Sequence, residues 1–410
     1  MNILLLVTEL NSANGICTQS VMREMVSRGH TVYCLTNHEK HGDLDKAIRY
    51  CYVKPRLVYR LLNGSDDRKI AKTIGLLLNK VKLAISYPTW PLISPLYARR
   101  IYRAAKAICQ ENHIDMIIPI YTQIDTLIAA NRIKKEMPDI RYIPYFLDSL
   151  SGGYGPKRFS KEWVIRRGIK WEEKLLPSAD KIVMMESSRP HYEKYCSEKS
   201  YFTKIIFSDL PLISQPKELI TPKQASDIIE LLYIGSIPSH IRNPEPFLKV
   251  FHHTKNERYR LSIIGTSTCG EVLSAYAKRD SRIVLCDPIS HDEAMKRVAD
   301  AAILVNLGNN IKEMTPSKIF EYMSYGKPII STMPISEEPS ASYLRQYPSS
   351  YLLEYKDIDY EVEAVKMEEW IDKSIDKRID FSSIETLFLK NTPAHFCDAV
   401  IEGSDNCEDS

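Results

Sequence analysis

Residues 313–328 combine a polar loop, a helix start and a glycine stop, and they hold the side chains best suited to chemistry. Thr315 is a favourable N-cap, and Pro316 suits the first helical position. A helix that begins there leaves the backbone amides of Ser317 and Lys318 without intrahelical acceptors. Those amides, the helix dipole and the Lys318 ammonium all favour an anion. The spacing therefore predicts a phosphate site at this helix start.

Two glutamates flank the predicted phosphate site. Glu313 precedes the helix and Glu321 lies just over one turn into it, so both carboxylates can face one ligand. A carboxylate accepts hydrogen bonds from two hydroxyls at once, which suits ribose and hexose rings. The arrangement predicts a ligand made of a sugar, a diphosphate and a ribose. The alternative is a surface helix whose glutamates are solvated and whose cap serves only stability.

Asp148 is a further candidate, because it follows an apolar run and precedes a loop that contains Gly152, Gly153 and Gly155. A carboxylate at such a strand end could orient a ligand hydroxyl or take its proton. The alternative role is to cap the glycine loop.

The elements that position these residues follow a repeated pattern of short apolar runs and amphipathic stretches. A continuous apolar run is typical of a strand buried on both faces of a parallel sheet. We predict strands in a first series at residues 2–8, 31–36, 116–121, 141–147 and 181–185, and in a second series at residues 228–235, 261–265, 282–286, 302–306 and 328–331. Alternation of strands with helices predicts an α/β protein with two doubly wound, Rossmann-like domains.

Length and composition support two domains, because 410 residues exceed what one core usually supports. We assign residues 1–208 to an N-terminal domain, 209–227 to a proline-punctuated linker, 228–385 to a C-terminal ligand-binding domain, and 386–410 to a terminal helix that packs back and an acidic tail. Ligands in such domains bind at the carboxyl ends of the strands, and two facing domains would form a cleft there.

Around residues 306–331 the sequence resembles a known family. Two glutamates separated by seven residues, followed by a helix ending in Gly326-Lys327-Pro328, look like the donor-site motif of family-four glycosyltransferases of the GT-B fold, and the version here is similar to bacterial enzymes of surface polysaccharide synthesis. The resemblance implies that Glu313 contacts the donor sugar, Glu321 the ribose, and the amides near Ser317 the diphosphate. It also implies retention of configuration and a nucleotide-sugar substrate, UDP- or GDP-linked, without another cofactor.

Three positions depart from that family or match it loosely. Gly235-Ser236-Ile237 stands where the family has Gly-Arg-Leu, so Ser236 replaces an arginine, and we nominate Arg242 as the phosphate cation. Leu147 replaces a histidine that many relatives carry beside Asp148. Gly15, in the first glycine loop, would let backbone approach the donor or acceptor, or would simply admit a helix.

Other signals are weaker. Asp43-Leu44-Asp45 and Asp357-Ile358-Asp359 have the spacing of a metal-binding pair, but neither follows a core strand, and we predict no metal site. His252 and His253 are adjacent on a predicted helix and project differently, so we interpret them as surface residues.

The charge is concentrated between residues 54 and 106, where twelve basic residues face two acidic ones and tyrosine and tryptophan are interspersed. This mixture suits the anionic surface of a membrane, although a pair of solvated helices would have a similar composition. Nine scattered cysteines, a first segment without a basic leader, and the absence of a long apolar stretch predict a cytoplasmic protein, peripheral at most to the inner face of the cell membrane. No motif indicates nucleic-acid binding.

We therefore expect transfer of a hexose from a nucleotide-diphosphate sugar to a hydroxyl of a lipid-linked or oligosaccharide acceptor. One alternative is a nucleotide-sugar epimerase of the same fold. A second is a catalytically inactive, glycosyltransferase-like scaffold subunit, which Ser236 and Leu147 would favour and the two glutamates oppose.

Overall fold

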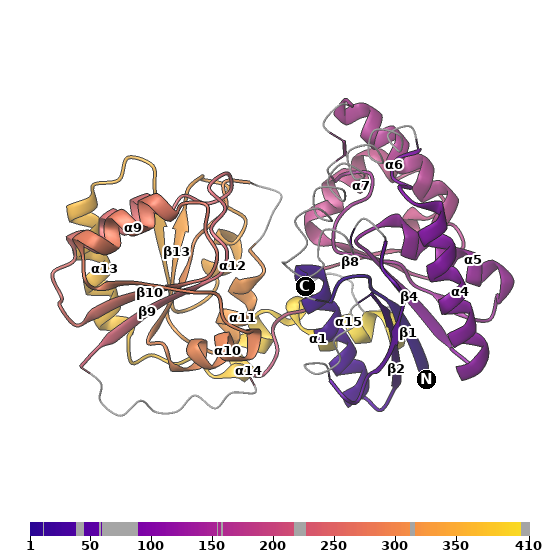
Figure 1. Cartoon of the computed structure of the whole chain (residues 1–410), viewed down its shortest axis with the longest axis horizontal. Coiled ribbons are helices and arrows are strands. Elements are labelled where there is room, and N and C mark those ends of the chain that lie inside the picture. The colour runs from indigo at the N-terminus through magenta and orange to yellow at the C-terminus, as the bar shows by residue number, and fades with distance from the viewer. Residues whose placement is uncertain are drawn as a thin grey trace, which may run out of the picture. The chain divides into compact units, whose positions relative to one another are not determined.

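Strands and helices alternate through both halves of the chain, as the apolar runs predict. The computed structural model describes residues 1–10, 12–37, 45–56, 59, 89–153, 155–156, 159–216, 227–311 and 316–402. Two compact units divide the chain: unit 1 is Met1–Pro211 with Pro393–Ser410, and unit 2 is Leu212–Thr392. Each unit has its own parallel sheet (Figure 1).

The sheet of unit 1 has the order β3-β2-β1-β4-β6-β7-β8, and β5 also pairs with β4. Its strands are β1 (Asn2–Leu6), β2 (Thr31–Thr36), β3 (Arg49–Tyr52), β4 (Met116–Tyr121), β5 (Arg141–Tyr142), β6 (Tyr145–Phe146), β7 (Ile182–Met185) and β8 (Ile205–Ser208). The central strands β1 and β4 are almost wholly buried, which is why their sequences are continuous apolar runs.

The strand predicted over residues 141–147 is wrong in one respect, because the structure divides it into β5 and β6. Pro144 lies between them and has no N–H group to donate to β4. The register survives the break, since Tyr142 pairs with Ile117 and Tyr145 with Ile120. The strand end that carries Asp148 is therefore still aligned with the end of β4.

Helices cover both faces of the unit 1 sheet (Figure 1). They are α1 (Ala13–Ser27), α4 (Pro95–Asn112), α5 (Ile124–Glu136), α6 (Lys161–Leu175) and α7 (Arg189–Cys196), with one-turn 3-10 helices η2 (Glu186–Ser188) and η3 (Phe202–Lys204). The pair α4 and α5 packs together on one face, and α1 lies on the other. This division follows from crossovers that run in opposite directions from the central strands.

The C-terminal segment returns to unit 1. It consists of α15 (Pro393–Cys397) and a π-helical turn, η5 (Asp398–Glu402), and α15 packs against α1. Arg28 joins the two, since its guanidinium donates to the Asp398 carboxylate at 2.5 Å and to the Ala394 carbonyl at 3.0 Å. The ring centroids of Phe396 and Tyr145 lie 4.6 Å apart, so this segment also covers β6.

The sheet of unit 2 has the order β11-β10-β9-β12-β13-β14, and all of its pairs are parallel. Its strands are β9 (Ile229–Ile234), β10 (Tyr259–Ile264), β11 (Ile283–Cys286), β12 (Ile303–Asn306), β13 (Ile329–Met333) and β14 (Ser350–Glu354). The strand order reverses between β9 and β12. In a doubly wound sheet, the carboxyl ends at that reversal form the usual ligand site.

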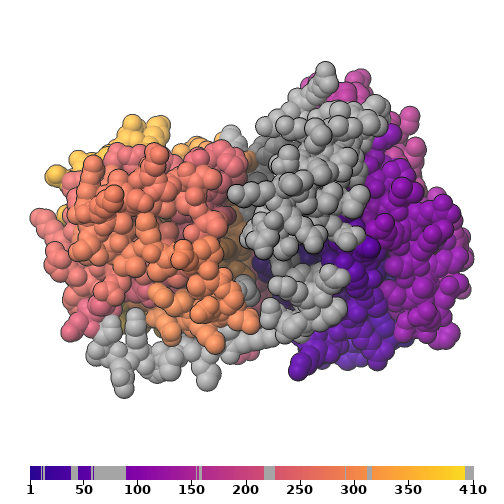
Figure 2. Space-filling view, viewed as in Figure 1, coloured from indigo at the N-terminus to yellow at the C-terminus, as the bar shows by residue number. Residues whose placement is uncertain are grey.

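The helices of unit 2 are α8 (Glu245–His253), α9 (Gly270–Arg279), α10 (His291–Asp300), α11 (Lys318–Ser324), α12 (Ala341–Leu344), α13 (Tyr360–Ser374) and α14 (Phe381–Leu387), with a 3-10 turn η4 (Leu389–Asn391). The helix α13 packs beside α8, and α14 packs against α11. Figure 2 gives the space-filling view, in which the salmon and orange segments of this unit, including α9 and α10, form much of its visible face.

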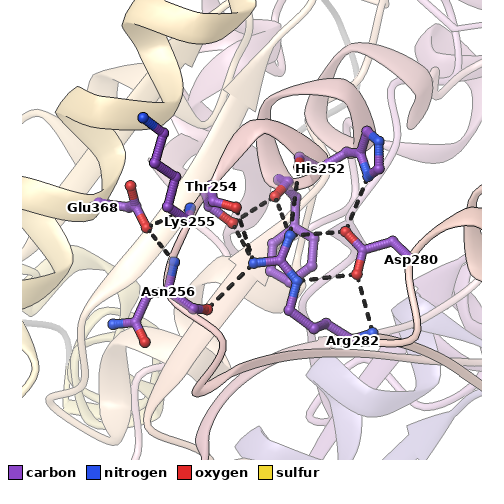
Figure 3. Close-up of polar contacts among 8 residues, drawn as sticks. His252, Thr254, Lys255, Asn256, Asp280, Arg282 and Glu368 are labelled. Atoms are coloured by element: carbon purple, nitrogen blue, oxygen red, sulfur yellow. Dashed lines mark hydrogen bonds and ion pairs between the residues drawn. The ribbon is translucent and has the colours of Figure 1, made fainter.

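A polar cluster closes the C-terminal end of α8 (Figure 3). Arg282 donates to both carboxylate oxygens of Asp280, at 3.0 and 2.8 Å, and to the carbonyls of Thr254 and Phe251 at 3.0 and 3.3 Å. It thereby adds donors to carbonyls at the end of the helix, where the backbone provides fewer partners, and the Phe251 carbonyl also accepts from the Thr254 amide at 3.1 Å. His252, interpreted above as a surface residue, is partly exposed, and its Nδ1 lies 3.1 Å from Asp280. Burial raises the pKa of Asp280, but hydrogen bonds from Arg282 and His252 outweigh it and hold the value below 3.8.

Candidate functional site

Two glycine turns stand at the carboxyl edge of the unit 2 sheet. Gly235 follows β9 with φ +153° and Gly265 follows β10 with φ +140°, which are conformations that side chains disfavour. A Cβ on Gly265 would lie 2.1 Å from the Gly235 carbonyl oxygen, and a Cβ on Gly235 would lie 2.8 Å from Lys318 Nζ. The two turns and the lysine are therefore in direct contact, and only glycine allows it.

Lys318 connects the first turn of α11 to the end of β9. Its ammonium donates to the Ile234 carbonyl at 2.6 Å, and the Ile234 amide donates to the Tyr322 hydroxyl at 3.2 Å. Burial lowers the pKa of Lys318, the carboxylate of Glu321 opposes this, and the charge of Arg242 lowers the pKa further. The ammonium thus stands half-buried beside a second cation.

Arg242 reaches the same turn from the loop that precedes α8. Its Nη1 donates to the Ser236 carbonyl at 2.7 Å, and its Nε donates to Asn309 Oδ1 at 2.9 Å. Asn309 is held in turn by the carboxylate of the buried Glu338, which accepts its amide at 3.2 Å. The structure therefore places Arg242 beside Ser236, the position where the resembling family has its own arginine.

The helix predicted to start at Pro316 begins two residues later. In the structure α11 starts at Lys318, and Ser317 is the N-cap in an α-helical conformation without a side-chain cap bond. Ile319 and Phe320 donate to the carbonyls of Pro316 and Ser317, both at 3.3 Å, so the first turn is tighter than an α-helix. Within the described part of the chain, the amides of Ser317 and Lys318 have no acceptor.

Of the two glutamates predicted to bind the ligand, Glu321 is among the described residues and Glu313 is not. Glu321 is half-buried on α11, three residues after Lys318 and on the same side of the helix. Glu313, with the predicted cap Thr315, lies outside the described residues. The structure therefore brings together Gly235, Lys318, Glu321 and Arg242, with Pro316 and Ser317 next to them along the chain.

A pocket of about 240 Å³ lies next to the glycine turns. It is lined by the ends of β10 and β11, by the turns after β9, β10 and β11, and by the start of α9. Its lining includes apolar Ile237, Ile263 and Leu273 and polar Ser267, Ser274 and Asp287. Ile237 holds two of these turns together, because its amide donates to Thr266 at 2.9 Å and its carbonyl accepts from Thr268 at 3.1 Å. Sites for whole small ligands run to roughly 300–1,000 Å³, so this volume suits one ring system of a larger ligand.

The motifs of the sequence predict neither this pocket nor the partners of Arg242. One signal could have indicated the pocket, namely a glycine directly after two successive strands, Gly235 and Gly265. Nothing in the spacing could have identified Asn309 and Glu338, because Asn309 lies 67 residues beyond Arg242 in the loop after β12, and Glu338 a further 29 residues along, after β13.

At the carboxyl edge of unit 1, Asp148 is exposed and Leu147 beside it is buried. Asn14 in the first turn of α1 donates to Asp148 Oδ2 at 3.1 Å. A Cβ on Gly15 would lie 2.2 and 2.3 Å from the carbonyl oxygens of Leu10 and Glu9. The chain that leads into α1 therefore leaves no space for a side chain at residue 15, which explains the glycine there.

The Asp-x-Asp pairs have other surroundings. Asp359 is the N-cap of α13 and accepts from the amides of Glu361 and Val362, both at 3.1 Å. Asp45 lies 3.9 Å from Arg23, and Asp43 lies outside the described residues. In the part of the chain that the structure describes, no three His, Cys, Asp or Glu residues gather as metal ligands. No described helix has the length and apolar character to cross a membrane.

Comparisons with known proteins find similarity over most of unit 2 and in the fold of the whole chain. Residues 229–364, which hold the whole cluster of Gly235, Arg242, Lys318 and Glu321, match the family described as "Glycosyl transferases group 1". The similarity to this family thus covers most of unit 2. The comparison with curated proteins gave no match.

Solved structures match the whole chain at low identity. A glycosyltransferase from Rickettsia africae ESF-5 has TM-score 0.60 and 14% identity, covering 98% of this chain and 97% of that one. WaaG, a glycosyltransferase of lipopolysaccharide biosynthesis, has TM-score 0.56 and 12% identity, with coverages of 97% and 99%. The lipopolysaccharide outer core galactosyltransferase WaaB has TM-score 0.53 and 14% identity, with coverages of 98% and 100%. The fold is that of the GT-B glycosyltransferases.

Proposed function

We propose that this GT-B chain, with its similarity to glycosyl transferases group 1, moves a hexose from a nucleotide-diphosphate sugar to a hydroxyl of a lipid-linked or oligosaccharide acceptor. The transfer is proposed to retain configuration, to need no metal, and to serve surface polysaccharide synthesis. One observation carries the proposal: Lys318 and Arg242 meet at the Gly235 turn, beside a pocket for one ring system.

The charges at the Gly235 turn favour a diphosphate. Lys318 and Arg242 bring two positive charges, and among the described residues the carboxylate of Glu321 acts on Lys318 in the opposite sense. Among the described residues, Lys318 donates one of its three N–H groups, to Ile234, and the other two are proposed to serve a ligand. A half-buried cation next to another cation gains when an anion arrives, because each phosphate oxygen accepts charge-assisted hydrogen bonds.

The rest of the donor follows from what surrounds that diphosphate. The 240 Å³ pocket lies beyond Gly235, on the side of Gly265, and would take the nucleobase of a UDP- or GDP-sugar. Glu321 would accept hydrogen bonds from ribose hydroxyls, and Glu313 is proposed for the sugar. Gly15, whose lack of a side chain the entry into α1 already requires, is proposed in addition to let the backbone approach the donor or acceptor.

In the reaction, the bond from the anomeric carbon to the diphosphate oxygen breaks and a bond from that carbon to the acceptor oxygen forms. Negative charge builds up on the leaving diphosphate, and Lys318 and Arg242, which both contact the Gly235 turn, are proposed to stabilise it. The acceptor hydroxyl loses its proton in the same step. Asp148, exposed at the carboxyl edge of unit 1, is proposed to orient that hydroxyl or to accept its proton.

An exposed face of α4 supports contact with an anionic membrane. Leu96 is 77% exposed, which is costly for an apolar side chain in water, and the exposed Arg99 and Arg103 lie three and seven residues further on. The same helical spacing puts all three on one side of α4. Much of the basic segment, residues 57–58 and 60–88, lies outside the described residues. We propose peripheral binding at the inner face of the cell membrane.

The test is transfer of radiolabelled sugar from UDP- and GDP-sugars to a lipid extract of the source cells, with product analysis by chromatography. Glu321→Ala should abolish transfer, whereas Glu369→Ala, an exposed glutamate on α13, should leave it unchanged. Full activity of Glu321→Ala would remove the assignment of the donor site. Release of an epimerised free nucleotide sugar, with no labelled lipid, would replace transfer by epimerisation.

A further inference from the structure

Asp148 belongs to a short turn, residues 148–152, that is braced from several sides. We call it the Asp148 turn. Inside it, the Ser149 hydroxyl accepts the Gly152 amide at 2.8 Å. The turn also contacts α7, because the Ser151 hydroxyl lies 2.8 Å from His191 Nε2 on that helix. The turn is thus closed on itself and attached to a neighbouring helix.

Glu172, on α6, is the centre of this bracing, and its side chain is fully buried. Its Oε1 accepts the Ser151 amide at 3.0 Å and the Tyr192 hydroxyl at 2.8 Å. Its Oε2 accepts the Tyr201 hydroxyl at 3.0 Å. The Tyr192 hydroxyl also accepts from Ser149 at 3.1 Å, so Glu172 reaches the turn at two points.

The fit between α6 and the turn is close. A Cβ on Gly168 would lie 2.5 Å from the Ser151 Cα, and a Cβ on Gly152 would lie 2.9 Å from the His191 ring. Backbone and ring therefore touch without space for a side chain. A turn packed this tightly has one position, and that position is set by α6 and α7.

A buried carboxylate is an expensive way to stabilise a core, because an apolar side chain of similar size usually serves as well or better. Burial raises the pKa of Glu172, and the hydrogen bonds of Tyr192, Ser151 and Tyr201 act against that. What a carboxylate can do and an apolar group cannot is to fix a backbone amide and two hydroxyls in one geometry.

We propose that Glu172 is a positioning residue for Asp148. It holds the Asp148 turn through the Ser151 amide and through Tyr192 and Ser149, so that the exposed Asp148 carboxylate and its partner Asn14 keep a fixed place at the edge of the sheet. The proposal rests on the acceptor-side function given to Asp148 above. Glu172 itself, fully buried, does not touch a substrate.

The chain offers a matched pair of variants. Tyr192→Phe and Tyr201→Phe each remove one buried hydroxyl from Glu172, and both residues have 0% exposure. Only the Tyr192 hydroxyl also contacts the turn, through Ser149. A merely structural role for Glu172 would make the two variants equal, whereas a positioning role separates them.

The experiment measures hydrogen exchange of the peptide that contains residues 148–152, together with sugar transfer to the lipid extract. We expect Tyr192→Phe to speed exchange of this peptide about tenfold or more and to lower transfer by roughly tenfold to a hundredfold. Tyr201→Phe should change both less than about twofold, and both variants should bind donor nucleotide like the wild type. Glu172→Gln should resemble Tyr192→Phe.

Equal exchange and equal transfer in the two tyrosine variants would overturn the proposal, even if both melt at lower temperature. The function of Asp148 is separated by Asp148→Asn, which should leave exchange of the turn unchanged and lower transfer. Normal transfer in Asp148→Asn with fast exchange in Tyr192→Phe would mean that Glu172 fixes the turn but that Asp148 does not act on the acceptor. That outcome would also overturn the role proposed here for Glu172 in the reaction.

Discussion

Replacing Lys318 by methionine separates binding of the donor from stability of the fold. The variant keeps an unbranched apolar stem at the Gly235 turn and removes the ammonium that donates to Ile234 at 2.6 Å. A charge-assisted hydrogen bond is worth about 1.5–3 kcal/mol. Since about 1.4 kcal/mol is a factor of ten, the Kd for the nucleoside diphosphate should rise roughly 10- to 150-fold.

Stability should change little in Lys318→Met. The variant loses one hydrogen bond to a carbonyl, but it also removes a charge that burial disfavours, as the lowered pKa of Lys318 indicates. The two effects oppose each other, so we expect the free energy of unfolding to stay within about 1 kcal/mol of the wild type. Lys249→Met, which removes a lysine paired with Glu245 on α8, is the matched control for charge and should not change the Kd.

The lowered pKa of Lys318 also predicts how nucleotide binding depends on pH. The pKa of Lys318 lies below the ordinary value of 10.5. At a pH below this lowered pKa, Lys318 is charged and the diphosphate binds with full affinity. As the pH rises through the lowered pKa, Lys318 loses its proton and the affinity for the diphosphate falls. The Met variant should lack this fall. Calorimetric titration with UDP and GDP across pH measures both effects. A Met variant that binds the preferred nucleotide within twofold of the wild type would refute the reasoning.

Further predictions concern the turns and the cluster of Figure 3. Gly265→Ala should destabilise unit 2 by roughly 1–3 kcal/mol and abolish nucleotide binding, because its Cβ would meet the Gly235 carbonyl at 2.1 Å; urea unfolding and calorimetry check this, and wild-type binding would contradict it. Arg282→Met should cost about 3 kcal/mol in urea unfolding, the lower end of the range for a broken buried pair, since Asp280, 6% exposed, loses its guanidinium partner and keeps His252. The pair of Asp280 and Arg282 stabilises the fold fully at a pH above the ordinary Asp pKa of 3.8, and this stabilisation is lost as the pH falls through the lowered pKa of Asp280. Arg282→Met should lack most of this acid dependence.

Much of the fold could be predicted because its central strands are buried on both faces. The runs at residues 31–36 and 116–121 are predicted with the boundaries that β2 and β4 have. Edge strands such as β3, with exposed or half-buried residues throughout, lack that signal and were not predicted. The break between β5 and β6 depends on Pro144, a single missing N–H within an otherwise apolar run.

The candidate site was predictable where one segment contains its parts and not where several meet. Lys318 and Glu321 belong to one helix, so their spacing alone suggested a common ligand. The start of α11 was wrong by two residues because the structure begins it with a tight turn after Pro316. The bracing of Asp148 by Glu172 joins residues far apart in the chain, and neither spacing nor composition contains that information.

The central claim is that unit 2 binds a nucleotide-diphosphate sugar at the Gly235 turn without a metal. The most direct measurement is the melting temperature of the purified protein with UDP, GDP, ADP and dTDP and their sugars, each with and without magnesium, beside Lys318→Met. We predict a rise with one nucleotide family, the same with and without magnesium, and a much smaller rise in the variant. A protein that responds to none of them, or only in the presence of magnesium, would contradict the account.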